Sequence, residues 1–484
     1  MEKLTLDNYI GGKDLLFSGQ RFEVNSPFYS DCNTLLPNSS LFEIKSAIFN
    51  ATKAVSDCRK LDFDDREKIL SDASKKLKFN SMSLEYTVKM TGMPIHYVKY
   101  KLDDIISELS AVPKLIRMRL GMSSSRLNNF VAKGTDLYAV LNPVDGFIYA
   151  VTPGNDPRTV PFVAAWSVAL GIPAIIKPSK NDFLISKQVV KAIVDSGYPA
   201  GGLNIIGWDT SQDESSKKNF ALVDSASVVW AFGDDKTVDN VLRFEVNENK
   251  NIIDHFSGKI ILRHASGRGA GVYEMTDDLK KNANIIVESA YEWPISCNSL
   301  KALFVTSTNY DELISNVREI TQKNFSNYVG DPMQPKTRVG YVSTSLLKYV
   351  NSRFESLNSL NLIKQVLPYK QISPNQTTPM LFELDNINSE FFSREYSLYL
   401  LSIKKSESFE NAVKDVNESS GPQKRIAVSV ISDDEEKVLG TYFHAHHVKR
   451  LRHSTELDVL YHEGNDYLYR LMIPQIHRVT QKFK

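Results

Sequence analysis

One cysteine in this sequence stands where a thiol could react with a substrate. Cys297 lies in a turn of small polar residues between Pro294 and Ser299, and not in an apolar stripe that would bury it. A thiolate is a strong nucleophile toward carbonyl carbon, and backbone N–H groups or a helix N-terminus can lower the pKa of a thiol from about 8.5. Most free cysteines, however, are small buried hydrophobic side chains. This segment alone therefore leaves both interpretations open.

The composition excludes several classes of protein. The 484 residues include 58 Lys and Arg against 57 Asp and Glu, so no overall field would attract nucleic acid or an anionic membrane. The three cysteines are too few for a disulfide framework or a zinc cage, and they fit a reducing compartment. The first residues lack an apolar signal region, and no run approaches the roughly 18 apolar residues of a membrane span. The sequence predicts a cytoplasmic protein of two or three domains.

Strands and helices alternate in the middle of the chain. Apolar strand patterns, separated by helical runs at 160–170 and 183–196, lie at 147–152, 174–176, 202–206 and 228–232. This order is typical of a parallel sheet with crossover helices. Such sheets bind ligands beyond the carboxyl ends of their strands, where Asn155, Lys177 and Gly233 fall. No GxGxxG fingerprint follows these strands, so a standard dinucleotide motif is absent.

The rest of the chain predicts further α/β structure. Amphipathic helices are expected over 41–60, from about Asp64 past Leu77, and up to about 118. A second α/β unit is expected from strand 301–305 onward, with a helix over 435–446. The C-terminal stretch 472–480 alternates like a strand without an obvious partner of its own, and such strands often complete the sheet of another subunit.

An ordered set of segments resembles the aldehyde dehydrogenase superfamily over essentially the whole chain. The segments are Asn8-Tyr-Ile-Gly-Gly-Lys13, Asp65-Arg-Glu-Lys-Ile-Leu70, Met90-Thr-Gly-Met-Pro94, Val151-Thr-Pro-Gly-Asn-Asp-Pro157, Ile175-Ile-Lys-Pro-Ser179 and Glu390-Phe-Phe392. The resemblance implies two parallel-sheet α/β domains and a small oligomerisation hairpin. The implied cofactor-binding domain covers 1–125 and 145–262, the catalytic domain covers 263–455, and the oligomerisation strands lie at 126–144 and 470–484.

The resemblance also implies roles for three catalytic residues. Cys297 would attack an aldehyde, and the thiohemiacetal would pass a hydride to NADP or NAD. Asn155, together with the Cys297 backbone N–H, would hold the developing oxyanion, and a donor of this kind lowers a barrier by about 3–4 kcal/mol. His264 occupies the position of the family's catalytic glutamate and, with an unperturbed pKa of about 6.5, could be the base that activates water. Without the resemblance, Asn155 is a good turn residue and His264 an ordinary strand-end histidine.

The missing glutamate leaves the fate of the thioester open. Release could be to coenzyme A, as in acylating members of the superfamily, or the reaction could run in the reductive direction, as in acyl-CoA reductases. A third alternative, motivated by His264 and Asp234, is a degenerate member that keeps the fold and a structural or binding role.

The resemblance implies nine cofactor-binding residues. They are Thr152, Pro153, Lys177, Ser179, Lys180, Gly233, Asp234, Glu390 and Phe392. Lys177 would contact the adenosine ribose and Glu390 the nicotinamide ribose, with Glu395 as the alternative carboxylate. Lys180 stands where an acidic residue is common and would favour the 2′-phosphate of NADP. Asp234 replaces a phosphate-binding hydroxyl and would repel the pyrophosphate.

The expected partners follow from the same resemblance. They are a small-molecule aldehyde, coenzyme A in the acylating alternative, and further copies of the chain in a homodimer or homotetramer, without nucleic acid or membrane. The region 324–385 and the loop after Thr455 are expected to shape the aldehyde tunnel, but the sequence does not identify the aldehyde.

Overall fold

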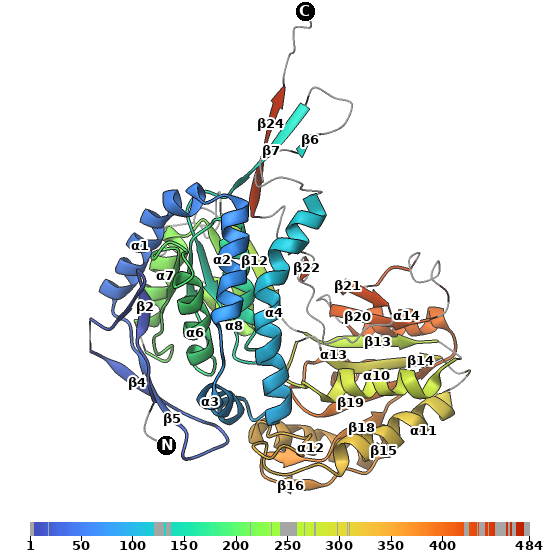
Figure 1. The fold of residues 1–484 in the computed structure, drawn as a ribbon. Helices are drawn as coiled ribbons and strands as arrows, with labels where there is room; N and C mark the ends of the chain where they lie inside the picture. The colour runs from blue at the N-terminus through green and yellow to red at the C-terminus, as the bar shows by residue number, and fades with distance from the viewer. Residues whose placement is uncertain are drawn as a thin grey trace, which may run out of the picture.

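The computed structural model contains two large sheets with helices packed around them and a third, small sheet that stands away from the body of the molecule (Figure 1). The structure describes residues 4–17, 19–120, 130–131, 137–212, 214–233, 235–242, 259–265, 267–274, 277–297, 299–306, 308, 310–420, 425–432, 434, 441–443, 445–450, 461–462, 465–466 and 471–478. Among these residues, no helix has the length and apolar character needed to cross a lipid bilayer.

The first large sheet has seven strands and is mainly parallel. Its order is β12 (Ile260–Ala265), β11 (Val228–Gly233), β8 (Ile148–Val151), β9 (Ala174–Lys177), β10 (Leu203–Ile205), β2 (Asn8–Ile10) and β3 (Lys13–Leu15). The first five strands run parallel, and the β2–β3 hairpin adds to β10 in the antiparallel sense. The predicted parallel sheet is confirmed. The boundary expected at 262 and 263 falls inside β12, which remains paired with β11 as far as Ala265.

Helices cover both faces of this sheet because alternate residues of a strand point to opposite sides. Ile148 and Ala150 of β8 pack with apolar side chains of one helical layer, and Tyr149 and Val151 pack with those of the other. The first layer contains α2 (Phe63–Lys76), α3 (Ser81–Thr91), α4 (Ile95–Leu120), α5 (Thr159–Leu170) and α6 (Phe183–Val194). The second layer contains α1 (Leu41–Lys60), α7 (Ser215–Ser225) and α8 (Asp235–Leu242).

Local sequence signals explain where several of these helices begin and end. Ser40 and Glu43 form a capping box at the start of α1, and Asp62 and Asp65 form another at the start of α2. Gly92 ends α3 in the left-handed conformation, with a φ of 73°. In α5 every residue is buried, which is consistent with its nearly continuous apolar sequence.

The second large sheet also has seven strands. Its order is β15 (Lys364–Leu367), β18 (Met380–Glu383), β19 (Leu400–Ser406), β14 (Leu300–Thr306), β13 (Gly269–Tyr273), β20 (Arg425–Ile431) and β21 (Ala445–Arg450). All neighbours are parallel except β15 and β18. The accompanying helices are α10 (Leu279–Tyr291), α11 (Tyr310–Thr321) with a π-helical turn at Gln322–Ser326, α12 (Thr344–Ser359), α13 (Glu390–Ser393) and α14 (Phe409–Ser419).

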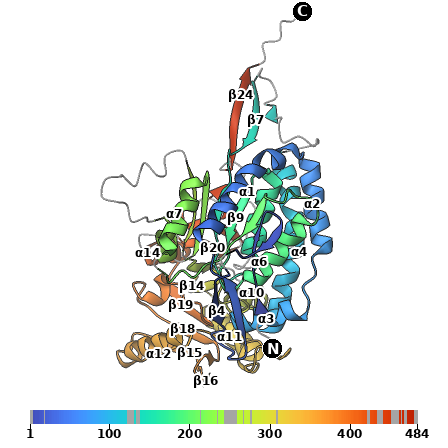
Figure 2. The ribbon, with the colours of Figure 1, turned by 90° about the vertical axis from the view of Figure 1, so that its left-hand side faces the viewer.

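The remaining strands form small sheets. At the N-terminus β1 (Leu4–Thr5), β5 (Asn33–Pro37) and β4 (Arg21–Asn25) pair in that order, and two short hairpins are formed by β16 (Gln371–Ser373) with β17 (Gln376–Thr377) and by β22 (Tyr461–His462) with β23 (Asn465–Asp466). The sheet that stands away from the body consists of β24 (Met472–Arg478), β7 (Leu137–Pro143) and β6 (Phe130–Val131), as both views show (Figures 1 and 2).

One expectation is wrong. The helix expected over 435–446 is contradicted where the structure describes it, because 441–443 are irregular and β21 is an edge strand parallel to β20. The helical pattern of this segment is weak, and its last residues pair with β20 instead. The sequence could not show this pairing, because β20 is a separate segment of the chain. The C-terminal strand, for which the sequence showed no obvious partner, pairs along its full length with β7 of its own chain, and both segments belong to the set expected as oligomerisation strands.

Candidate active site

A cavity of about 1090 Å³ lies where the carboxyl ends of the first sheet face the second. The first sheet contributes the segments that follow β8, β9, β10 and β11, and the other wall contains Arg268, Cys297 and residues of 393–397. Asn155, Lys177 and Gly233 all line this cavity, as expected for residues that follow neighbouring parallel strands.

Cys297 is the most accessible of the three cysteines. Its side chain is half-buried at the cavity wall, whereas Cys32 and Cys58 are buried in the core. Burial raises the pKa of the Cys58 thiol to about 11 and also raises that of Cys32. These two thiols therefore stay protonated and unreactive near neutral pH. The nucleophile expected from the sequence occupies the position that a substrate can reach.

The turn that carries Cys297 is held by backbone and side-chain bonds. It follows α10, and the Ser296 backbone N–H donates to the Trp293 carbonyl at 3.0 Å. The buried Lys301 amine donates to the carbonyls of Pro294, at 2.7 Å, and Leu398, at 2.9 Å. Burial lowers the pKa of Lys301 to about 7, against the opposing effect of Glu395. Lys301 thus joins the turn that carries Cys297 to the 394–399 segment.

The Asn155 amide is attached to the same turn. Its Nδ2 donates to the Ile295 carbonyl at 2.9 Å, and the Trp293 indole N–H donates to the Asn155 backbone carbonyl at 2.8 Å. An amide nitrogen carries two N–H groups, so one can serve Ile295 while the other reaches an acceptor in the cavity. Cys297 is therefore neither deeply buried nor remote from Asn155, and both line one cavity.

Gly267 places a backbone directly against Cys297, a feature that the sequence did not single out. A Cβ atom at this position would lie 1.9 Å from the Cys297 carbonyl oxygen, so only glycine fits. The Gly267 N–H donates to Glu395 Oε2 at 2.7 Å. The glycine-rich stretch before Cys297 was the available signal, but it does not say which glycine makes the contact.

The expected base is described only in part. His264 is the penultimate residue of β12, where its backbone pairs with Phe232. The His264 side chain lies outside the described residues, so its role as a base stays a prediction.

Six of the nine expected cofactor residues line the cavity, and the others do not or cannot be placed. The six are Thr152, Pro153, Lys177, Ser179, Lys180 and Gly233, and Asp234 lies outside the described residues. Among the described residues that line the cavity, Glu395 is present and Glu390 and Phe392 are not. Glu390 instead accepts a bond from the Tyr349 hydroxyl at 2.6 Å and pairs with Arg353. Phe392 is buried against Phe304, with ring centroids 5.2 Å apart.

The cavity offers groups that fit a nicotinamide cofactor. The Thr152 hydroxyl is buried and, within the described part of the chain, has no hydrogen-bond partner, so it could donate to or accept from a bound molecule. Lys177 lies over the Trp208 ring at 4.9 Å, and desolvation lowers the pKa of its amine to about 8 despite the opposing effect of Asp209. These groups suit the hydroxyls and phosphates of a dinucleotide.

Charges of both signs line the cavity. Lys180 lines it, and so do Glu23 and Asp209. The pKa of Asp209 is lowered first by a backbone bond from Ser211 and also by the nearby Lys180. A 2′-phosphate would be attracted by Lys180 and repelled by the carboxylates, so these charges do not by themselves select NADP over NAD.

Comparisons with known proteins agree with one another. The family model described as "Aldehyde dehydrogenase family" matches residues 17–441. Malonate-semialdehyde dehydrogenase 2 of Geobacillus thermodenitrificans (strain NG80-2) is 24% identical over 210 residues, 42% of this chain and 42% of that protein. The acylating mitochondrial methylmalonate-semialdehyde dehydrogenase of Arabidopsis thaliana is 25% identical over 201 residues, 41% of this chain and 32% of that protein. The matches thus span less than half the length of these curated relatives.

A solved structure extends the similarity to the whole fold. The NAD-dependent aldehyde dehydrogenase from Sinorhizobium meliloti superimposes with a TM-score of 0.81 at 17% identity, covering 100% of this chain and 96% of that one. The two chains therefore share their overall fold.

Proposed function

The chain belongs to the aldehyde dehydrogenase family, as its ordered motifs predicted, and we propose that it oxidises a small-molecule aldehyde with NADP or NAD through Cys297. The observation that carries this proposal is the shared cavity, in which an accessible thiol stands beside an amide donor and next to strand ends that suit a dinucleotide.

The chemistry at Cys297 follows from the geometry. The thiolate attacks the aldehyde carbon, a C–S bond forms, and the carbonyl π electrons move to the oxygen. The Asn155 amide and the Cys297 backbone N–H donate to this oxyanion, which stabilises it most if they are aligned before the reaction. Bound NADP or NAD would supply the acceptor for the hydride that leaves this carbon. The carbonyl then re-forms as a thioester on Cys297.

The residues proposed to hold the cofactor come from three strand ends, those of β8, β9 and β11. Thr152, Lys177, Ser179 and Gly233 would contact it along the first sheet. Glu395, rather than Glu390, would accept bonds from the nicotinamide ribose, because Glu395 is the one of the two that lines the cavity.

Release of the thioester has two alternatives. Water would need a base, for which His264 is the candidate. Release to coenzyme A would regenerate the thiol without that base, and the similarity to an enzyme whose name includes "acylating" favours this second function. The substrates named for the relatives, malonate and methylmalonate semialdehyde, are the first aldehydes to test.

The small sheet is the proposed oligomer contact. β24 and β6 are its edge strands, and the sheet extends beyond the helices that cover the body (Figure 2). Exposed strand edges pair readily with other chains. The proposed assembly is a homodimer or homotetramer joined through this sheet. The proposed location is the cytoplasm, where reduced thiols such as Cys297 persist.

A panel of aldehydes, each with NAD or NADP and with or without coenzyme A, tests the proposed function. Absorbance of the reduced cofactor is expected with at least one combination. Cys297→Ala should abolish the signal, because without this thiol the thiohemiacetal cannot form. Cys32→Ala is the matched control, since this thiol is buried in the core away from the cavity. A signal that survives in Cys297→Ala would overturn the proposed mechanism, and dependence on coenzyme A would identify the acylating alternative.

A further inference from the structure

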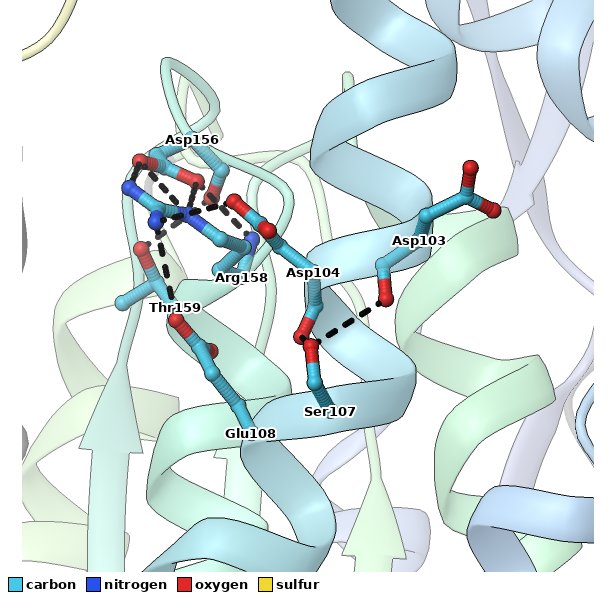
Figure 3. Close-up of polar contacts among 7 residues, drawn as sticks. All are labelled: Asp103, Asp104, Ser107, Glu108, Asp156, Arg158 and Thr159. Atoms are coloured by element: carbon cyan, nitrogen blue, oxygen red, sulfur yellow. Dashed lines mark hydrogen bonds and ion pairs between the residues drawn. The ribbon is translucent and has the colours of Figure 1, made fainter.

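A cluster of buried charges surrounds Arg158, and one of its members, Asp156, directly follows Asn155 in the chain (Figure 3 draws Asp104, Glu108, Asp156 and Arg158). The Arg158 cluster consists of Lys101, Asp104 and Glu108 of α4 together with Asp156 and Arg158 of the segment between β8 and α5. The Arg158 side chain is only 6% exposed. None of the five is among the described residues that line the cavity, so the cluster is separate from the proposed substrate and cofactor contacts.

Arg158 joins three carboxylates. Its Nε and Nη2 form a fork on Asp156, at 3.0 Å to Oδ1 and 2.7 Å to Oδ2. Its Nη1 lies 3.5 Å from Asp104 Oδ2 and 3.5 Å from Glu108 Oε1. A buried charge is costly unless it is paired in good geometry, and a planar fork on a carboxylate is the strongest of these arrangements. The guanidinium therefore binds the β8–α5 segment to α4.

The same contacts fix the backbone around Asp156. Its carboxylate also accepts from the Arg158 backbone N–H at 3.0 Å, and its carbonyl accepts from the Thr159 hydroxyl at 3.1 Å. Asp156 is thus held through its side chain and its main chain. Asn155 is covalently attached to it, so the position of Asp156 limits where the Asn155 amide can point.

The cluster has a second connection to the nucleophile turn. The Lys101 amine lies 5.7 Å from the centre of the Trp293 ring, within the range of a cation–π contact. The Trp293 indole donates in turn to the Asn155 carbonyl. Helix α4 is therefore connected to Asn155 both through Asp156 and through Trp293.

We propose, on the basis of the proposed function, that Arg158 is a positioning residue, which acts through Asp156 to hold the Asn155 amide in the direction of the oxyanion. Arg158 touches neither substrate nor cofactor in this proposal. An oxyanion donor contributes most when it needs no reorganisation, and a displacement of about 1 Å can reduce a rate about 100-fold. Removing the fork of Arg158 on Asp156 should therefore weaken the stabilisation of the oxyanion by Asn155, although Asn155 itself is still present.

A double-mutant cycle tests this coupling. Arg158→Met is expected to lower kcat/KM by roughly 10- to 100-fold, because the donor is displaced. In the Asn155→Ala background the same substitution should change kcat/KM far less, because the donor on which Arg158 acts is already gone. Cofactor affinity, measured by fluorescence titration, should stay close to that of the native protein. Effects that multiply in the double variant would overturn the proposal.

Two further variants separate positioning from folding. Asp103→Asn is the matched control, since Asp103 is an exposed carboxylate on α4 that points away from Arg158 (Figure 3) and should leave kcat/KM unchanged. Arg158→Lys keeps a charge in the cluster but loses the fork, so it should fold and restore only part of the rate. Full activity in a folded Arg158→Lys protein would show that the fork does not position Asn155.

A readout without substrate distinguishes this inference from the proposed function. The pH profile of Cys297 alkylation reports on the turn that Asn155 holds through Ile295. Arg158→Met and Asn155→Ala should shift this profile in the same direction, with little further shift in the double variant. If the native protein oxidises no aldehyde, the proposed function fails, while independent shifts in this profile would overturn the positioning role by itself.

Discussion

Two arginine–carboxylate clusters near the cavity show how much burial changes the meaning of the same chemistry. The Arg158 cluster lies between α4 and the β8–α5 segment, and its arginine side chain is 6% exposed. The second, the Glu390 cluster, consists of Tyr349 and Arg353 of α12, Glu390 of α13 and the adjacent Arg394. Its Arg353 side chain is 46% exposed. A family motif drew attention to Glu390, whereas no motif pointed to Arg158.

Partner groups lower the pKa of both central carboxylates, Asp156 and Glu390, but the two clusters differ in how far water can reach them. Burial alone would raise the pKa of Asp156, but the charge and bonds of Arg158 lower it to about 2. Burial opposes a lower pKa at Glu390 as well, and bonds from Tyr349 and Arg353 lower it. At the exposed cluster, water can replace a lost partner. At the buried cluster it cannot, so each partner there should matter far more.

The largest expected change in stability follows the loss of the Asp156 carboxylate. Asp156→Asn should lower the free energy of unfolding by about 3–5 kcal/mol, since the buried Arg158 charge would lose its bidentate carboxylate and keep only the longer contacts to Asp104 and Glu108. Urea denaturation measures this change, with Asp103→Asn on the exposed side of α4 as the control. A midpoint for Asp156→Asn that matches the control would mean that burial does not distinguish the two clusters.

A smaller effect is expected in the pH dependence of stability. Burial raises the pKa of Glu108 from 4.5 to about 7, more than Arg158 lowers it. Between these values the folded state holds a proton that the unfolded state has released, so Glu108 makes stability fall as pH rises, by at most about 1.4 kcal/mol per pH unit. Asp156 acts in the opposite sense, because its contribution is present above 3.8 and is lost as pH falls toward 2.

Glu108→Gln should therefore flatten the stability profile between about pH 4.5 and 7 and leave the acid limb in place. Urea midpoints measured at several pH values test this expectation. An unchanged slope would show that Glu108 does not hold its proton in the folded protein.

The smallest effect is expected at the exposed cluster. Glu390→Gln removes a charge whose partners remain in contact with water, so its urea midpoint should shift less than those of Asp156→Asn and Glu108→Gln. A shift as large as that of Asp156→Asn would remove the distinction between the clusters.

Much of the site could be predicted from local patterns. Strand and helix periodicity predicted the parallel sheet, and the rule for strand ends placed Asn155, Lys177 and Gly233 at one edge. The choice between Glu390 and Glu395 could not be predicted in this way. Only five positions separate them, but α13 turns Glu390 toward α12, while Glu395 in the irregular segment that follows reaches Gly267.

The sequence by itself determined the alternation of strands and helices, the family, and a cysteine in a polar turn, because each of these is a short-range pattern. The tertiary structure decided which strand pairs with which, including β21 and β24, and which charged side chains are buried together. Residues 101–108 and 156–158 are far apart in the chain, and the energy of a buried charge depends on the neighbours that folding brings to it. For that reason the coupling of α4 to Asn155 appears only in three dimensions.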